Sequence, residues 1–129
     1  MPRVLVIDDQ RHVRAAITVA LRVRGFHVSA FESGRLRLIE LDREDFDLAI
    51  IDIVMPEMDG VKVIRSLHER RPDLAVIAIS GASQPSSGRP MIDVLRAADD
   101  LSHVVRLKKP FRADELMRAT QVALASRLG

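Results

Sequence analysis

Short apolar runs alternate with longer amphipathic stretches along the whole chain. The runs are rich in Val, Ile, Leu and Ala and have the length of strands. They lie at residues 4–7, 26–31, 48–51, 74–79 and 104–107. Because the runs are nearly continuous rather than interrupted by polar residues, they predict strands buried on both faces, as in a parallel sheet between two layers of helices.

The stretches between these runs have the length and periodicity of helices. Apolar residues of the first stretch follow the spacing of one helix face, at Val13, Ala16, Ile17, Ala20 and Leu21. Gly25 then follows as a C-terminal stop. Further helices are predicted at residues 33–42, 60–71, 90–100 and 112–127. The pattern therefore predicts five successive strand–helix units and a doubly wound α/β fold.

The composition suits a single domain that covers residues 1–129. The chain is 47% apolar, which is enough for a core, and its lack of cysteine excludes disulfides and thiolate metal sites. No run approaches the ~20 apolar residues of a membrane span, and two aspartates end the first run before a signal peptide could form. These features predict a cytoplasmic protein without membrane insertion.

The charge pattern does not favour a nucleic-acid partner. The pI is about 9.7, but 20 Lys and Arg nearly balance 18 Asp and Glu, and the formal net charge is only +2. Aromatic residues make up 3% of the chain, without Trp or Tyr, so a stacking platform for single-stranded nucleic acid is missing. A mixed, solvated surface is the simpler interpretation.

Carboxylates directly follow two of the predicted strands. Asp8 and Asp9 come after the first run, and Asp52 comes after the third. Because the carboxyl ends of parallel strands share one edge of the sheet, we expect the three side chains to converge there. Asp8 or Asp9 alone could equally cap a helix, but three adjacent carboxylates repel one another and need shared protons or a cation. The absence of His and Cys from the motif favours Mg²⁺, which prefers oxygen ligands.

Two further polar residues are predicted at the same edge. Ser80 follows the fourth run, and Lys109, itself followed by Pro110, comes after the fifth. A carboxylate nucleophile, a divalent metal, a hydroxyl and an ammonium together form a site for a phosphoryl group, where catalysis is mostly positioning and charge neutralisation. Asp52 would then become an acyl phosphate.

These motifs also carry a family resemblance that extends over essentially the whole chain. The motifs are the aspartate pair after the first strand, DIVMPEMDG at residues 52–60, Ser-Gly-Ala after the fourth strand and KKPF near the end. As a set, they resemble the receiver domains of bacterial two-component response regulators, in particular the stand-alone, chemotaxis-regulator type. The resemblance implies a flavodoxin-like sheet with strand order 2-1-3-4-5, and a bond between Lys109 and Pro110 that is often cis.

The resemblance further implies which residues hold the metal. By this analogy, Asp52 is the phosphoacceptor and a metal ligand, and Asp9 binds Mg²⁺ directly. Asp8 would bind the ion through water, and Val54 would bind it through its backbone carbonyl.

The resemblance also implies partners and a mode of action. Ser80 and Lys109 would hold the phosphoryl oxygens. The donor would be a histidine kinase or a histidine phosphotransfer protein, and the output a contact with a downstream protein through the fourth helix, fifth strand and fifth helix. A phosphorylation-dependent homodimer is left open. Such a domain is no enzyme beyond self-phosphorylation from small donors and slow self-dephosphorylation.

Two features depart from the family pattern. Arg106 stands three residues before the motif lysine, where receivers usually carry the Tyr or Phe that reports phosphorylation. A guanidinium is rarely buried unpaired, so Arg106 is expected to face solvent or a carboxylate. The span from Ser80 to Lys109 is also longer than usual, around the Ser, Gly and Pro-rich loop at residues 81–90. We hypothesise that this loop adapts the surface to a particular partner.

Other functions are less consistent with the sequence. A receiver-like interaction module that is never phosphorylated would explain the altered switch position. An aspartate-nucleophile phosphatase also uses Mg²⁺, but it needs a second aspartate two residues after its nucleophile, where Asp8 is followed by Gln10. A nucleotide-binding protein would need a Gly-rich phosphate loop, which is missing.

Overall fold

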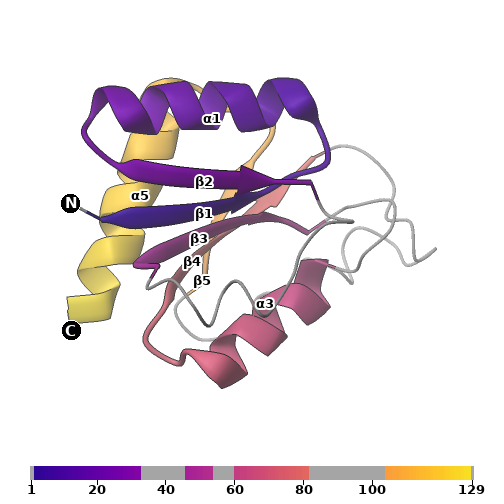
Figure 1. Cartoon of the computed structure of the whole chain (residues 1–129), viewed down its shortest axis with the longest axis vertical. Coiled ribbons are helices and arrows are strands. Elements are labelled where there is room, and N and C mark those ends of the chain that lie inside the picture. The colour runs from indigo at the N-terminus through magenta and orange to yellow at the C-terminus, as the bar shows by residue number, and fades with distance from the viewer. Residues whose placement is uncertain (1, 33–45, 54–59, 82–103, 129) are drawn as a thin grey trace.

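The computed structural model is an α/β fold built on a central parallel sheet (Figure 1). It describes residues 2–32, 46–53, 60–81 and 104–128. Some predicted features lie outside the described residues. These are the helices at residues 33–42 and 90–100, the polar loop beyond Gly81, and Val54.

The sheet has five strands in the predicted order β2-β1-β3-β4-β5, and every neighbouring pair is parallel. The strands are β1 (Arg3–Ile7), β2 (His27–Phe31), β3 (Leu48–Asp52), β4 (Ala75–Ser80) and β5 (Val104–Lys108). All arrows in Figure 1 point the same way, so the carboxyl ends of the strands lie along one edge. The prediction of a doubly wound parallel sheet is confirmed.

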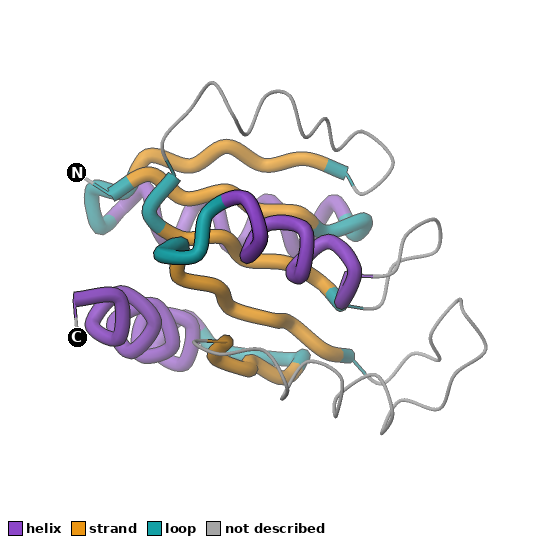
Figure 2. Tube along the Cα trace, turned by 90° about the horizontal axis from the view of Figure 1, so that it is seen from below, coloured by secondary structure: helices purple, strands orange, loops and turns teal. Residues whose placement is uncertain are grey.

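Helices cover both faces of this sheet. Helices α1 (Arg11–Val23) and α5 (Ala113–Leu128) pack on one face, and α3 (Gly60–Arg70) packs on the other. Figure 2 views the sheet from the side of α3, with α1 behind the strands. The arrangement follows from the crossover rule, because each parallel connection must carry its helix over one face of the sheet.

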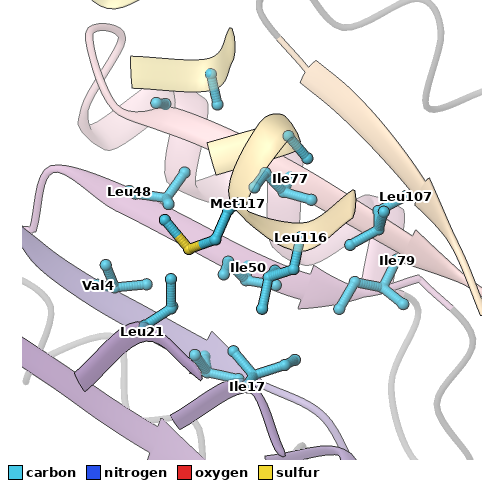
Figure 3. Packing of buried hydrophobic residues seen from close by; sticks show 14 of the residues in the cluster. Val4, Ile17, Leu21, Leu48, Ile50, Ile77, Ile79, Leu107, Leu116 and Met117 are labelled. Atoms are coloured by element: carbon cyan, nitrogen blue, oxygen red, sulfur yellow. The ribbon is translucent and has the colours of Figure 1, made fainter. Parts of the chain in front are cut away.

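Successive residues of each central strand point to opposite faces. In β1, Val4 and Val6 belong to the core under α1 and α5, whereas Leu5 and Ile7 belong to the core under α3. Figure 3 shows the first of these cores, where side chains of α1 and α5 contact those of β1, β3, β4 and β5. Because both cores are apolar, the strands need nearly continuous hydrophobic sequences, as the pattern indicated.

Gly25 ends the first helix as predicted. Its φ is 91°, a conformation that favours glycine, and its amide donates a hydrogen bond to the Arg22 carbonyl at 2.9 Å. The amide of Phe26 donates to the Leu21 carbonyl at 3.1 Å. Phe26 is therefore part of the helix end, and β2 begins one residue later than predicted.

Several other boundaries also differ from the prediction by one residue. The Leu74 amide donates to the Arg71 carbonyl in a turn, so β4 begins at Ala75. At their carboxyl ends, the pairing of β3 with β4 continues through Asp52, which lies opposite Ile79. Asp52 is thus the last residue of its strand, and the sheet itself fixes its backbone. Among the described residues, no helix is long and apolar enough to cross a membrane.

Candidate functional site

Three carboxylates meet at the carboxyl edge of the two central strands β1 and β3. Asp8 is completely buried, Asp52 is 3% exposed and Asp9 is half-buried. One carboxylate oxygen from each of them lies within 4.8 Å of the others. The predicted convergence is therefore present, and it places two buried acids beside one that solvent can reach.

The side chain of Lys109 contacts two carboxylates of this cluster. Its Nζ atom donates a hydrogen bond to Asp52 Oδ2 at 2.9 Å and forms an ion pair with Asp8 Oδ2 at 3.0 Å. The side chain is 15% exposed. Its backbone amide donates to the Ser80 carbonyl at 2.6 Å, and its peptide bond to Pro110 is cis, as the resemblance implied. The backbone of Lys109, the residue after β5, is thereby hydrogen-bonded to Ser80 at the end of β4.

The electrostatics of the cluster keep Lys109 charged. Burial alone would lower the pKa of its ammonium group. Contacts with the carboxylates of Asp52 and Asp8 outweigh this effect, so the pKa is raised above its ordinary value. The ammonium consequently offsets part of the negative charge of the three aspartates at neutral pH.

Ser80 and Gly81 complete this edge of the sheet. Ser80 ends β4 as a buried residue and pairs with Lys108 of β5. A Cβ atom on Gly81 would lie 3.5 Å from Cδ of Lys109, an ordinary van der Waals distance. The small residue thus leaves room beside the lysine stem, and the hydroxyl-bearing residue stands at the same strand ends as the acids.

The acidic cluster fits a hard divalent cation. Asp8 Oδ2 is buried without a hydrogen-bond partner, although the Lys109 ammonium lies beside it. A buried carboxylate oxygen next to two other carboxylates can serve as a ligand for Mg²⁺, since this ion prefers oxygen ligands and retains waters. Asp8, Asp9 and Asp52 would hold the ion, which would supply positive charge next to Asp52.

Two residues at the site were not predicted from the sequence. Gln10 accepts a hydrogen bond at Oε1 from Lys109 Nζ at 2.9 Å. Arg14, one helical turn later, donates from Nη1 to the Asp8 carbonyl at 2.6 Å and lies 3.6 Å from Glu32 Oε1. The only available signal was their position just after the aspartate pair, at the start of a helix.

Arg106 and Lys108 lie on the exposed side of the edge strand β5. Arg106 is exposed, as expected of a residue that faces solvent or a carboxylate, and Lys108 is an exposed neighbour of the motif lysine. The position usually occupied by an aromatic switch therefore presents a positive charge on the surface.

Comparison with known proteins gives a consistent family assignment. The family model of the response regulator receiver domain matches residues 4–121. The response regulator receiver protein CpdR of Brucella abortus (strain 2308) is 35% identical over 124 residues, and the match covers 96% of this chain and 98% of that protein. The response regulator MprA of Mycolicibacterium vanbaalenii is 33% identical, and the match covers 95% of this chain but 50% of that protein.

Solved structures show the same fold. A CheY-like response regulator receiver domain protein from Methanospirillum hungatei JF-1 superposes with a TM-score of 0.84 at 21% identity, covering 99% of this chain and 97% of that one. A response regulator receiver protein from Sinorhizobium medicae WSM419 gives a TM-score of 0.81 at 24% identity, and the match covers 98% of this chain and 96% of that one. At these identities, the likeness supports the fold alone.

Proposed function

The chain belongs to the response regulator receiver domain family, and within that family we propose that Asp52 is the residue that accepts the phosphoryl group. The protein is a phosphorylatable receiver of two-component signalling. The observation that carries the proposal is the position of the Asp52 carboxylate. It is buried, lies beside two further acids and accepts a hydrogen bond from Lys109 at 2.9 Å.

The proposed reaction is transfer of a phosphoryl group to a carboxylate. An oxygen of Asp52 attacks phosphorus, the bond from phosphorus to the imidazole nitrogen of a donor phosphohistidine breaks, and that nitrogen keeps the electron pair and takes up a proton. The product is an aspartyl phosphate. Lys109 would balance the charge that gathers on the phosphoryl oxygens, and Ser80 would donate a hydrogen bond to them.

Mg²⁺ is the cofactor that we propose for this step, held by Asp8, Asp9 and Asp52. Bound there, it would neutralise charge between the acceptor carboxylate and the incoming phosphoryl group. Val54 lies outside the described residues, and its carbonyl stays a prediction as a further ligand.

We further propose that the domain acts as a phosphoryl acceptor and signals by contact, rather than turning over a substrate. Its family implies a kinase or phosphotransfer partner and a downstream target. We propose a histidine kinase or histidine phosphotransfer protein as donor and a protein as target. A cytoplasmic location remains a prediction from the sequence.

The test is phosphorylation by a small donor. The purified chain is incubated with phosphoramidate and Mg²⁺, and intact mass is recorded for wild type, Asp52→Asn and the control Asp114→Asn, which changes an exposed carboxylate on α5. We expect a gain of one phosphoryl group in wild type and control, but none in Asp52→Asn or with EDTA. Equal phosphorylation of Asp52→Asn would disprove the assignment.

A second candidate is an interaction module that is never phosphorylated. The exposed Arg106 in place of an aromatic switch is the observation in its favour. The same experiment decides between the two functions, because a wild type that takes up no phosphoryl group from phosphoramidate or from any histidine donor supports the silent module.

A further inference from the structure

Gln10 contacts two charged residues of the site, Asp8 through its backbone and Lys109 through its side chain. Its backbone amide donates to Asp8 Oδ1 at 2.8 Å, and its side-chain oxygen accepts from Lys109 Nζ at 2.9 Å. Gln10 and Lys109 are 99 positions apart in sequence. The contact therefore joins the start of α1 to the end of β5 across the acidic cluster.

Gln10 occupies a position where another residue type would serve the helix better. It is the N-cap of α1, with extended backbone angles (φ −88°, ψ 113°), yet its side chain makes no capping hydrogen bond. Ser, Thr, Asp or Asn at an N-cap stabilises a helix by accepting a hydrogen bond from the first turn, whereas glutamine is not a preferred cap. The side chain instead extends to Lys109, which is a role for the site rather than for the helix.

The number of contacts around Lys109 matches the donors of its ammonium group. An ammonium carries three N–H donors, and three side chains contact Nζ: Asp52 and Gln10 accept hydrogen bonds, and Asp8 forms an ion pair. Two of these partners are carboxylates of the proposed metal and phosphoryl site. Their oxygens would be taken by a cation or by phosphorus during the reaction, while the amide oxygen of Gln10 would not.

We propose that Gln10 is a positioning residue that holds the Lys109 ammonium at the rim of the site while the oxygens of Asp8 and Asp52 bind the cation or the phosphoryl group instead of the lysine. This inference rests on the proposed function, since it concerns the same phosphoryl transfer. Gln10 acts through Lys109 and does not touch the reacting atoms. Its neutral amide anchors the ammonium without adding a fourth negative charge to the cluster, which would repel an incoming phosphoryl group.

The first test is the rate of phosphorylation by phosphoramidate at saturating Mg²⁺. Gln10→Met keeps the length of the side chain but removes the acceptor oxygen, and Gln121→Met makes the same change at an exposed position of α5. We expect a rate constant about three- to tenfold lower for Gln10→Met, the range of one ordinary hydrogen bond. The Mg²⁺ concentration for half-maximal rate should stay within about twofold of wild type, and Gln121→Met should match wild type.

A second variant separates positioning from a structural role. In Gln10→Ser, the side chain can cap α1 but is too short to reach Lys109. We expect its thermal midpoint to rise and its phosphorylation rate to fall as in Gln10→Met, so that stability and rate move in opposite directions. If Gln10 served only the helix, the rate would instead be unchanged or higher in this variant.

The third readout observes the lysine directly. The chain contains three lysines, Lys62, Lys108 and Lys109, so ¹⁵N labelling of lysine gives few ammonium signals, and Lys109→Arg identifies the relevant one. We expect the Lys109 ammonium signal of the metal-free protein to shift or broaden in Gln10→Met and to be restored in Gln10→Glu, which keeps an acceptor oxygen. The Gln121→Met control should leave it unchanged.

The outcomes separate this inference from the proposed function. If wild type is phosphorylated but Gln10→Met is equally fast, or if the ammonium signal is the same in both, Gln10 does not position the lysine. If wild type takes up no phosphoryl group, the proposed function fails, and the ammonium signal then decides on the Gln10 contact alone. An unchanged signal in that case overturns the inference as well.

Discussion

Lys109 Nζ lies 2.9 Å from Asp52 Oδ2, and this contact joins two residues that are 57 positions apart. One ends β3 in the middle of the sheet, and the other follows the edge strand β5. The ammonium also lies 3.0 Å from the completely buried Asp8. In the metal-free site, the lysine is thus the cation beside two buried acids.

Replacing Lys109 should therefore destabilise the metal-free protein. Lys109→Met leaves the carboxylates of Asp8 and Asp52 buried without the ammonium, and we expect the free energy of unfolding to fall by about 2–3 kcal/mol, because an uncompensated buried charge is strongly unfavourable. Urea unfolding in EDTA measures this. Lys108→Met is the matched control on the exposed side of β5, with an expected change within about 0.5 kcal/mol. An equal loss in both variants would contradict the assigned role of the ion pair.

Removing the half-buried acid should have the opposite effect. Asp9→Asn relieves repulsion among three carboxylates whose oxygens lie within 4.8 Å, so we expect the metal-free protein to gain about 1 kcal/mol in free energy of unfolding. The measurement is urea unfolding in EDTA, with Asp114→Asn as a control that should change little. A loss of stability in Asp9→Asn would show that this carboxylate is already compensated.

Mg²⁺ should stabilise the wild type through the same acids. At a free Mg²⁺ concentration ten times the Kd, binding to the folded state alone raises the free energy of unfolding by about 1.4 kcal/mol. Unfolding curves with and without Mg²⁺ test this. Asp9→Asn should reduce or abolish the Mg²⁺ effect, whereas an effect of equal size in that variant would place the ion elsewhere.

Alkaline pH should weaken the fold through Lys109. Its pKa is raised in the folded state, so its stabilising contribution is complete below the ordinary lysine value of about 10.5 and is lost as pH rises through the folded pKa. The chain has no Tyr or Cys, and three lysines, so few other groups titrate in this range. We expect the free energy of unfolding in EDTA to decrease above about pH 10.5 in wild type and to change less in Lys109→Met. An equal decrease in the free energy of unfolding with pH in the two proteins would show that Lys109 does not cause this pH dependence.

Much of the fold could be predicted from the sequence alone. The five apolar runs became the five strands, because a strand covered on both faces needs a continuous apolar sequence, and this requirement is visible residue by residue. Gly25 was recognisable as a helix stop, since its conformation at φ 91° is one that other residues rarely adopt. Two of the strands, β2 and β4, start one residue later than predicted, because the apolar side chains of Phe26 and Leu74 belong to turns that pack against the core.

The members of the candidate site could also be named in advance, because parallel strands bring their carboxyl ends to one edge. This rule places Asp8, Asp9, Asp52 and Ser80 together without any knowledge of their side-chain conformations. It determines which residues meet, but not which atoms bond.

Only the tertiary structure decided the contacts within that set. Strand order and register bring Lys109 over Asp52 and Asp8, and the path of the chain into α1 brings Gln10 within 2.9 Å of the lysine. Such contacts depend on distances between segments that are far apart in sequence and on the direction of each side chain. A pattern of hydrophobic and polar positions carries neither, since it records only which face of an element each residue occupies.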